Sequence, residues 1–167
     1  AQVVNILQPA TALGSSITAQ SNASCFAGSN GSATVQATGG TGPYSYSWNT
    51  IPAQTSATTT DLGAGSYTCT IADANGCTTT RNVTITQPAA ALSSSITAQT
   101  NVSCFGNNSG SATVNANDGT APYTYSWNTT PVQSGPTAVG LTGGTWTCTI
   151  TDANGCTTIR NVTITEP

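Results

Sequence analysis

The sequence predicts an all-β protein made of tandem β-sandwiches, and three observations support this class. Apolar residues alternate with Ser, Thr or Asn along several short segments, which is the period of two that β-strands show. Turn-forming residues separate these segments at the spacing expected for a sandwich. The second half of the chain repeats the first, so the same small fold is expected twice.

An internal repeat with an offset of 79 residues divides the chain. The segment SSITAQSNASCF at 15–26 returns as SSITAQTNVSCF at 94–105, and 51 of the 79 aligned positions are identical. We therefore expect one sandwich over 10–88 and a second over 89–167. Residues 1–9 align with the end of a unit, and we expect them to form the last strand of a preceding repeat in a longer array.

Within the first unit, the strand pattern recurs between turn-forming segments. The predicted strands lie near 15–20, 32–38, 44–49, 55–60, 66–72 and 77–86. The tetrapeptide Asp-Ala-Asn-Gly at 73–76 separates the last two strands and indicates a hairpin, because Gly supplies a positive φ. It returns at 152–155. About seven short strands per unit is typical of an immunoglobulin-like sandwich.

Aromatic residues at strand spacing are expected in the core. Tyr46 and Trp48 alternate with Ser in the third predicted strand. Several aromatics on one side of a strand in a small sandwich face the core more often than they form a platform for sugars. The predicted core aromatics are Tyr46, Trp48, Tyr67, Tyr125, Trp127 and Trp146.

Each unit contains three cysteines, and disulfides in an oxidising compartment are the simplest use for them. A sandwich of this size has a small core and gains stability from cross-links. Three pairings are open within the first unit, and each leaves one thiol over. Loop entropy favours Cys25–Cys77, at about 4 kcal/mol, over Cys69–Cys77, at about 2.5 kcal/mol, while Cys25–Cys69 is the rival pairing.

The middle cysteine of each unit occupies a distinct place. Cys69 follows Tyr67 by two residues, much as the F-strand cysteine of an immunoglobulin domain follows its corner tyrosine. The strand expected to face it offers Val35 instead of a cysteine. A buried free thiol packing beside Trp48 is therefore expected for Cys69, and the equivalent is expected for Cys148.

Charged side chains are scarce, and this excludes several classes of function. Ser and Thr make up 52 of the 167 residues, whereas only two Arg and five acidic residues are present, with no His. An enzyme, a metal site and a bound cofactor are not expected, because the usual acids, bases and zinc ligands are nearly absent. The net charge is −3, and no basic patch is present that could bind phosphates or anionic lipids. We therefore expect neither nucleic-acid binding nor membrane insertion.

Five sequence blocks occur in the same order in both units. They are Asn-x-Ser-Cys-Phe (22–26; 101–105), Gly-Ser-Ala-Thr-Val (31–35; 110–114), Pro-Tyr-x-Tyr-Ser-Trp (43–48; 122–127), Gly-x-Tyr/Trp-Thr (65–68; 144–147) and Asp-Ala-Asn-Gly-Cys-Thr (73–78; 152–157). In this order they resemble the SprB repeat. Such repeats build very large cell-surface adhesins of Bacteroidota and are related to PKD-type sandwiches.

The resemblance implies a function outside the cell. It implies a rigid spacer in an adhesin or filament that the type IX secretion system exports and displays on the cell surface, and that serves gliding motility. The implied partners are neighbouring repeats, identical chains in a filament, an external surface or polysaccharide bound by other parts of the parent protein, and the gliding and secretion machinery. A non-motile structural filament, and a spacer or carbohydrate-binding module of a secreted enzyme, are the alternatives.

The resemblance also bears on the cysteines. The loop and hairpin cysteines recur in the family, which supports the pairs Cys25–Cys77 and Cys104–Cys156. Cys69 and Cys148 stand where such repeats often carry Val. This departure leaves a link between units or chains open for the third cysteine of each unit.

Overall fold

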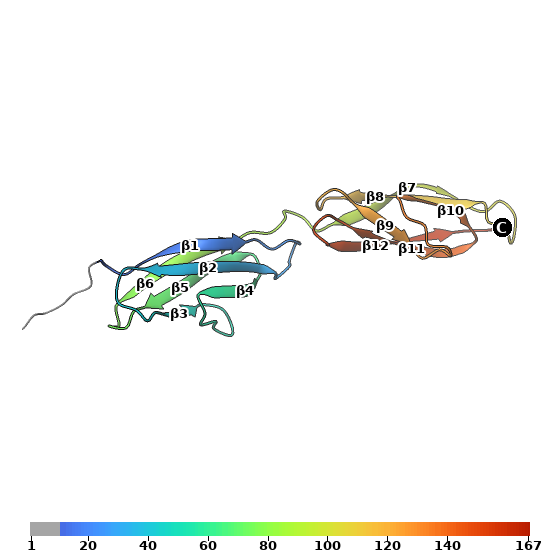
Figure 1. The fold of residues 1–167 in the computed structure, drawn as a ribbon. Helices are drawn as coiled ribbons and strands as arrows, with labels where there is room; N and C mark the ends of the chain where they lie inside the picture. Colours follow the sequence, from blue (N-terminus) through green and yellow to red (C-terminus); the bar gives the residue numbers. More distant parts are fainter. Residues whose placement is uncertain (1–10) are drawn as a thin grey trace, which may run out of the picture. The chain divides into compact units, whose positions relative to one another are not determined.

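The computed structural model describes residues 11–167, so the strand expected over residues 1–9 lies outside the described residues. Contacts between residues divide the chain into two units (Figure 1). The first contains the described residues up to Ala23 together with Ala27–Gln87, and the second contains Ser24–Phe26 together with Pro88–Pro167. No helix in the described part of the chain is long and apolar enough to cross a membrane.

The first unit is a sandwich of two antiparallel sheets with three strands each. One sheet has the strand order β1-β2-β4 and the other has the order β3-β5-β6. The strands are β1 (Gly14–Ser21), β2 (Gly31–Thr38), β3 (Ser45–Trp48), β4 (Thr58–Leu62), β5 (Gly65–Ala72) and β6 (Thr78–Ile85). Five of them match the predicted ranges to within one residue, and β4 begins three residues later than predicted.

The second unit repeats this arrangement strand for strand. Its sheets have the orders β7-β8-β10 and β9-β11-β12. The strands are β7 (Ser93–Thr100), β8 (Gly110–Asn117), β9 (Thr124–Trp127), β10 (Thr137–Leu141), β11 (Gly144–Thr151) and β12 (Thr157–Ile164). All pairs are antiparallel, as expected for strands joined by short turns.

Both units have the immunoglobulin-like topology, reduced by one strand. The two sheets correspond to strands A, B and E and to strands C, F and G of an immunoglobulin sandwich. Residues 49–57, between β3 and β4, form bends and irregular loop where strand D would lie. The described residues therefore contain six strands per unit instead of the predicted seven or so.

The core forms where the apolar sides of the two sheets meet. In β2, Ala33 and Val35 are 1 % exposed, while Thr34 between them lies nearer the surface. Trp48 and Trp127 are also 1 % exposed. The other four predicted core aromatics are partly buried and pack against the core clusters: Tyr46, Tyr67, Tyr125 and Trp146.

Each unit has one arginine that ties its two sheets together. β1 and β6 lie at the edges of different sheets and contact one another. From β6, Arg81 donates through Nε to the Ser15 hydroxyl at 3.2 Å and through Nη2 to the Ser15 carbonyl oxygen. Arg160 makes the same contacts with Ser94 in the second unit. The arginines thus contact the backbone of the facing sheet.

Replacing Arg81 with Met should lower the free energy of unfolding of the first unit by about 1–3 kcal/mol. Met keeps an apolar stem of similar length but leaves the Ser15 carbonyl without its charged donor. Urea unfolding, with hydrogen exchange of β1 and β6 to assign the transition to the first unit, measures the loss. The matched variant Arg160→Met should destabilise the second unit by a similar amount. A change below about 0.5 kcal/mol in both variants would show that these contacts add nothing.

Candidate functional site

The loop cysteine and the hairpin cysteine of one repeat lie at opposite ends of the sandwich. The backbone N–H of Ala23 donates to the Thr86 carbonyl oxygen at 2.9 Å, which places the Cys25 loop where β6 ends. Cys77 immediately precedes β6. A strand of eight residues is about 25 Å long, whereas the two Cα atoms of a disulfide lie about 4.4–6.8 Å apart. Cys25 and Cys77 therefore cannot pair within one unit.

The second unit has the same geometry, so the pair Cys104–Cys156 is excluded there too. The backbone N–H of Val102 donates to the Thr165 carbonyl oxygen at 3.0 Å, which places the Cys104 loop where β12 ends. Cys156 lies at the other end of this eight-residue strand. The two pairings that the family resemblance supports are thus wrong, because the last strand of each unit separates the loop cysteine from the hairpin cysteine.

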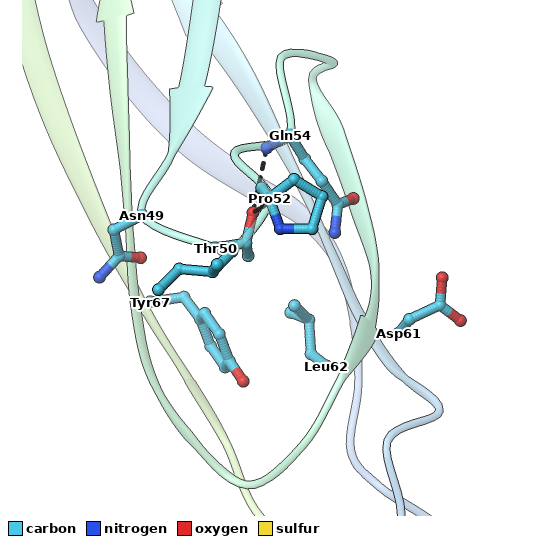
Figure 2. A pocket seen from close by; sticks show the side chains of 8 residues that line it. Asn49, Thr50, Pro52, Gln54, Asp61, Leu62 and Tyr67 are labelled. Carbon is cyan, nitrogen blue, oxygen red and sulfur yellow. Dashed lines mark hydrogen bonds between the residues drawn. The ribbon is translucent and has the colours of Figure 1, made fainter.

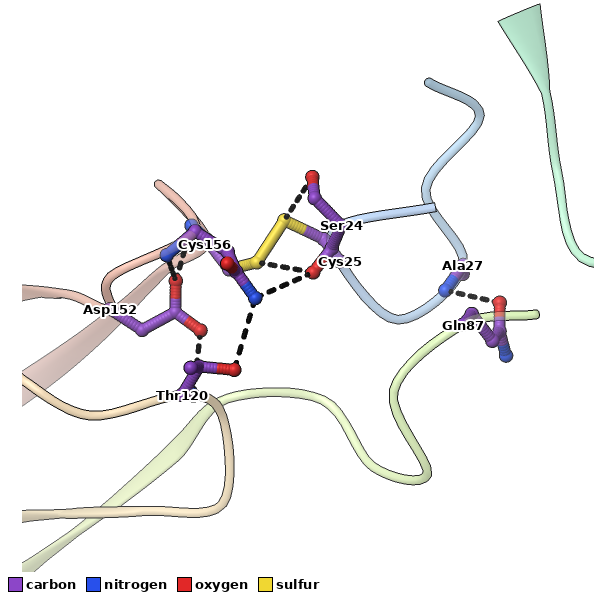
Figure 3. The surroundings of a disulfide bond; sticks show 8 residues. Ser24, Cys25, Ala27, Gln87, Thr120, Asp152 and Cys156 are labelled. Atoms are coloured by element: carbon purple, nitrogen blue, oxygen red, sulfur yellow. Dashed lines mark hydrogen bonds between the residues drawn. A yellow bond between two sulfur atoms is a disulfide. The ribbon is translucent and has the colours of Figure 1, made fainter. Parts of the chain in front are cut away.

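The structure instead joins Cys25 to Cys156, with 5.7 Å between the Cα atoms (Figure 3). The loop residues Ser24–Phe26 group by their contacts with the second unit. The disulfide therefore connects the loop of the first sequence repeat with the hairpin of the second. Cys77 and Cys104 are exposed free thiols, and Cys69 and Cys148 are buried free thiols.

An aspartate organises the hairpin that carries Cys156. The Asp152 carboxylate accepts three backbone N–H bonds, from Thr120, Asn154 and Cys156, each 2.9 Å long. Asp73 accepts the equivalent bonds at 2.9–3.1 Å in the first unit. These bonds fix the Asp-Ala-Asn-Gly turn and the backbone of the cysteine that follows it.

These bonds also set the protonation of the two aspartates. Burial raises the pKa of Asp73, but the backbone donors together outweigh burial and hold this pKa below its usual value. The pKa of Asp152 is lowered for the same reasons. Both side chains are therefore carboxylates at neutral pH, and both hairpins depend on that charge state.

Acid should destabilise both units through these aspartates. A carboxylate with a lowered folded-state pKa stabilises the fold above its unfolded pKa of about 3.9, and this stabilisation is lost as the pH falls through the folded pKa. We therefore expect the urea midpoint to hold steady down to about pH 5 and to decline below about pH 4. In the double variant Asp73→Asn and Asp152→Asn, the midpoint at neutral pH should be lower and the acid decline shallower. An unchanged acid decline in this variant would contradict the assignment.

The groups around the disulfide hold its loop against the hairpin (Figure 3). Asn154 Nδ2 donates to the Ser24 carbonyl oxygen at 3.3 Å and to the Thr120 hydroxyl at 3.0 Å. The Ser24 carbonyl oxygen also lies 3.5 Å from Cys156 Sγ. On the other side of the loop, the Ala27 N–H donates to Gln87 Oε1 at 2.9 Å. The disulfide is thus accompanied by a specific set of polar contacts.

A hollow of about 280 Å³ lies beside the disulfide. It is lined by Cys25, Phe26, Ala91, Leu92, Gly155, Cys156 and Thr157. The Phe26 side chain is 45 % exposed here, whereas the equivalent Phe105, next to the free Cys104, is 82 % exposed. Phe26 is therefore partly covered where the disulfide has formed.

A second hollow, of about 470 Å³, lies in the first unit beside the loop after β3 (Figure 2). Its lining residues are Asn49, Thr50, Ile51, Pro52, Gln54, Asp61, Leu62 and Tyr67. The Gln54 N–H donates to the Thr50 hydroxyl at 3.0 Å, and the Tyr67 hydroxyl donates to the Gly63 carbonyl oxygen at 3.1 Å. The first bond lies within the loop after β3, and the second holds the turn between β4 and β5. Asp61 is the one carboxylate among the lining residues.

The buried thiols belong to the core. Cys69 and Cys148 are 0 % exposed, and Cys69 is paired in register with Trp48 on the neighbouring strand. Burial raises the pKa of the Cys69 thiol, and a backbone hydrogen bond involving Ser47 opposes this only in part. The pKa of Cys148 is raised in the same way. In the structure, Cys69 and Cys148 are therefore buried thiols and do not link units or chains.

Thiol labelling should separate the cysteines into three classes. In the native protein, iodoacetamide should modify the two exposed thiols, Cys77 and Cys104, and leave Cys69 and Cys148 unmodified. Denaturation without a reductant should raise the number of labelled thiols to four, and reduction should raise it to six. Mass spectrometry of the intact chain counts the labels. Fast native labelling of Cys69 or Cys148 would contradict the buried placement.

Comparisons with known proteins agree with this fold. The family model of the SprB repeat matches residues 17–53 and 96–131, so the resemblance found in the sequence is confirmed over both segments. No curated protein matches the chain by sequence. The three N-terminal domains of the bacteriophage RB49 Highly Immunogenic Outer Capsid protein (Hoc) are similar in structure, with a TM-score of 0.51 and 18 % identity.

The match to the phage protein covers 93 % of this chain and 59 % of that one, so the chain spans about three fifths of its length. The N-terminal eight Ig domains of Down Syndrome Cell Adhesion Molecule match with a TM-score of 0.38 and 11 % identity, over 93 % of this chain and 25 % of that one. At 18 % identity the likeness to the phage protein concerns the fold alone.

Proposed function

We propose that this chain, which carries two SprB repeats, is a non-catalytic spacer segment of an extracellular protein displayed on a bacterial cell surface. We place its repeats at 10–88 and 89–167. The proposal includes a role in adhesion and gliding motility in Bacteroidota, with export by type IX secretion, as the repeat family implies. Its partners are then neighbouring repeats, and the binding of an external surface or polysaccharide falls to other parts of the parent protein.

The observation that carries the proposal is the covalent link between two sequence repeats. Cys25 belongs to the first repeat and Cys156 to the second, 131 residues further along the chain. In the chain-entropy account, closing a loop of this length stabilises the folded state by about 5 kcal/mol. Such disulfides persist in oxidising surroundings outside the cytoplasm. This supports an extracellular module in which two sequence repeats are cross-linked.

The same link suits a protein that bears tension. A force applied to the two chain ends passes from Cys25 through the disulfide to Cys156, so the 130 residues between these cysteines are not stretched. A spacer that unravelled under load would lengthen and slacken, whereas a cross-linked one transmits the force. The cross-link therefore supports a role in force transmission.

Antibody labelling of living source cells tests the proposal. An antibody raised against 10–88 should label intact cells, and brief treatment of those cells with an external protease should remove the label. In gliding cells the label should travel along the cell body. Label that stays fixed on the surface would overturn the gliding role. Label that requires permeabilised cells, or that occurs only in the medium, would overturn the cell-surface role.

A further inference from the structure

One loop cysteine and one hairpin cysteine of this chain are joined, and the other loop cysteine and the other hairpin cysteine are free. Cys104 is the counterpart of Cys25, and Cys77 is the counterpart of Cys156, each at the repeat offset of 79 residues. Both free thiols are exposed. The disulfide Cys25–Cys156 shows that this type of loop and this type of hairpin fit together. The described residues therefore contain one loop and one hairpin of this type that are not bonded to each other.

The hairpin around Cys77 already has the geometry of the joined hairpin. The Cys77 N–H donates to Asp73 Oδ1 at 2.9 Å, as the Cys156 N–H donates to Asp152 Oδ1 at 2.9 Å. Asn75 Nδ2 donates to the Thr41 hydroxyl at 3.1 Å. In the joined hairpin, Asn154 makes the equivalent bond and also donates to the Ser24 carbonyl oxygen. The Cys77 hairpin is thus preorganised to receive a loop of the same type.

The apolar side chain of Leu13 lies beside this hairpin. Leu13 is the counterpart of Leu92, which lines the hollow beside the disulfide together with Phe26. A Cβ built on Gly40 would lie 3.1 Å from Leu13 Cδ1 and 2.9 Å from Asp73 Oδ2. Leu13 therefore flanks the same turn as the aspartate of the hairpin, where it can cover the phenylalanine of an incoming loop.

The loop around Cys104 is preformed as well. The Gly106 N–H donates to Glu166 Oε2 at 3.1 Å, as the Ala27 N–H donates to Gln87 Oε1. Phe105 is 82 % exposed, nearly twice the exposed fraction of Phe26. In the joined loop the equivalent Phe26 lines the hollow beside the disulfide, so Phe105 is the side chain that a docked hairpin would cover.

We propose that the Cys104 loop of one chain docks on the Cys77 hairpin of a second copy of this chain and forms the disulfide Cys104–Cys77. Phe105 then packs against Leu13 of the second copy. The two surfaces differ, so the contact is head-to-tail, and each added copy presents a new free loop. The product is an open, covalently linked series of chains. This inference goes beyond the proposed function, because it rests on the fit between a cysteine loop and a cysteine hairpin and not on adhesion.

The bond forms by ordinary thiol–disulfide exchange. With glutathione disulfide as the oxidant, one protein thiolate attacks a glutathione sulfur and releases one glutathione thiolate. The second protein thiolate then attacks the protein sulfur of the mixed disulfide and releases the other glutathione. Two protein thiols lose two electrons and two protons, and one glutathione disulfide becomes two glutathione molecules. In a cell envelope, a protein disulfide of the thiol-oxidising class would serve as the oxidant.

Cross-linking of the purified chain tests this inference with two matched single variants. Incubated with glutathione disulfide, the wild-type chain should give a ladder of multimers on a non-reducing gel, and a reductant should collapse the ladder. Cys77→Ser alone and Cys104→Ser alone should stay monomeric, while an equimolar mixture of them should give dimers and nothing larger. Since both positions are exposed, the variants should keep the wild-type thermal midpoint, which is measured alongside.

Two results would overturn the inference. One is a wild-type chain that stays monomeric, and the other is Cys77→Ser dimerising alone as fast as the mixture does, which indicates a symmetric Cys104–Cys104 bond. A further variant tests the docking surface itself. Phe105→Ala should slow cross-linking about tenfold, while Ile51→Ala, at a residue 100 % exposed and remote from both thiols in sequence, should not change the rate. Failure here leaves the cell-labelling test of the proposed function unaffected.

Discussion

Stretched between its two ends, the oxidised chain should extend by only a small part of its contour length. The disulfide Cys25–Cys156 shields the 130 residues between these cysteines, so the stretched part is limited to 1–25 and 156–167. Reduction of the bond should release the shielded residues. At about 3.3–3.6 Å per extended residue, the released contour length is about 430–470 Å.

Single-molecule force spectroscopy with handles at the chain ends measures this release directly. The variant Cys25→Ser should extend like the reduced wild type without any reductant, because it lacks the cross-link. Cys77→Ser should behave like the oxidised wild type, because Cys77 takes no part in that bond within the chain. An oxidised wild type that unfolds both units to full length would refute the proposed load path.

Trp48→Ala should bring the first unit close to unfolding and leave the second unit folded. Trp48 is 1 % exposed, and its Nε1–H donates to the Ser56 carbonyl oxygen at 2.9 Å. Loss of a buried Trp costs about 3–5 kcal/mol. Domains are stable by about 0.05–0.15 kcal/mol per residue, so the free energy of unfolding of a unit of this size is roughly 4–12 kcal/mol.

Hydrogen exchange with mass spectrometry distinguishes the two units in this variant. Amides of β2 and β5 should lose protection, while amides of β8 and β11 should keep it. Trp127→Ala is the mirror variant and should reverse the pattern, since Trp127 is equally buried and donates to the Gly135 carbonyl oxygen at 3.0 Å. Ile51→Ala, at an exposed side chain, should change neither unit. Equal loss of protection in both units would show that they unfold as one.

The alternation of apolar and polar residues was sufficient to predict the strands. It located five strands of the first unit to within one residue, because strands with one buried face require a period of two. It placed β4 too early, since the Ser and Thr residues from 55 onward suit a loop as well as a strand. The missing strand of the immunoglobulin pattern could not be foreseen from composition, because residues 49–57 are as polar as the strands around them.

The disulfide was not predicted because sequence spacing says nothing about the end of a sandwich at which a residue lies. Loop entropy and the recurring family cysteines both favoured Cys25–Cys77, but the eight residues of β6 separate the two. Strand order carried the missing information. A loop directly after the first strand and a hairpin directly before the last strand lie at opposite ends whenever those two strands run in the same direction.

Disulfide mapping identifies the cysteine to which Cys25 is bonded. Cleaved after aromatic residues and arginine under non-reducing conditions, with free thiols blocked at the start, the chain yields Cys25 in 1–26, Cys77 in 68–81, Cys104 in 82–105 and Cys156 in 147–160. The structure predicts that the monomer gives 1–26 cross-linked to 147–160, with fragmentation locating the bond at Cys156. A cross-link between 1–26 and 68–81 would place the disulfide within one repeat and contradict the bond between Cys25 and Cys156.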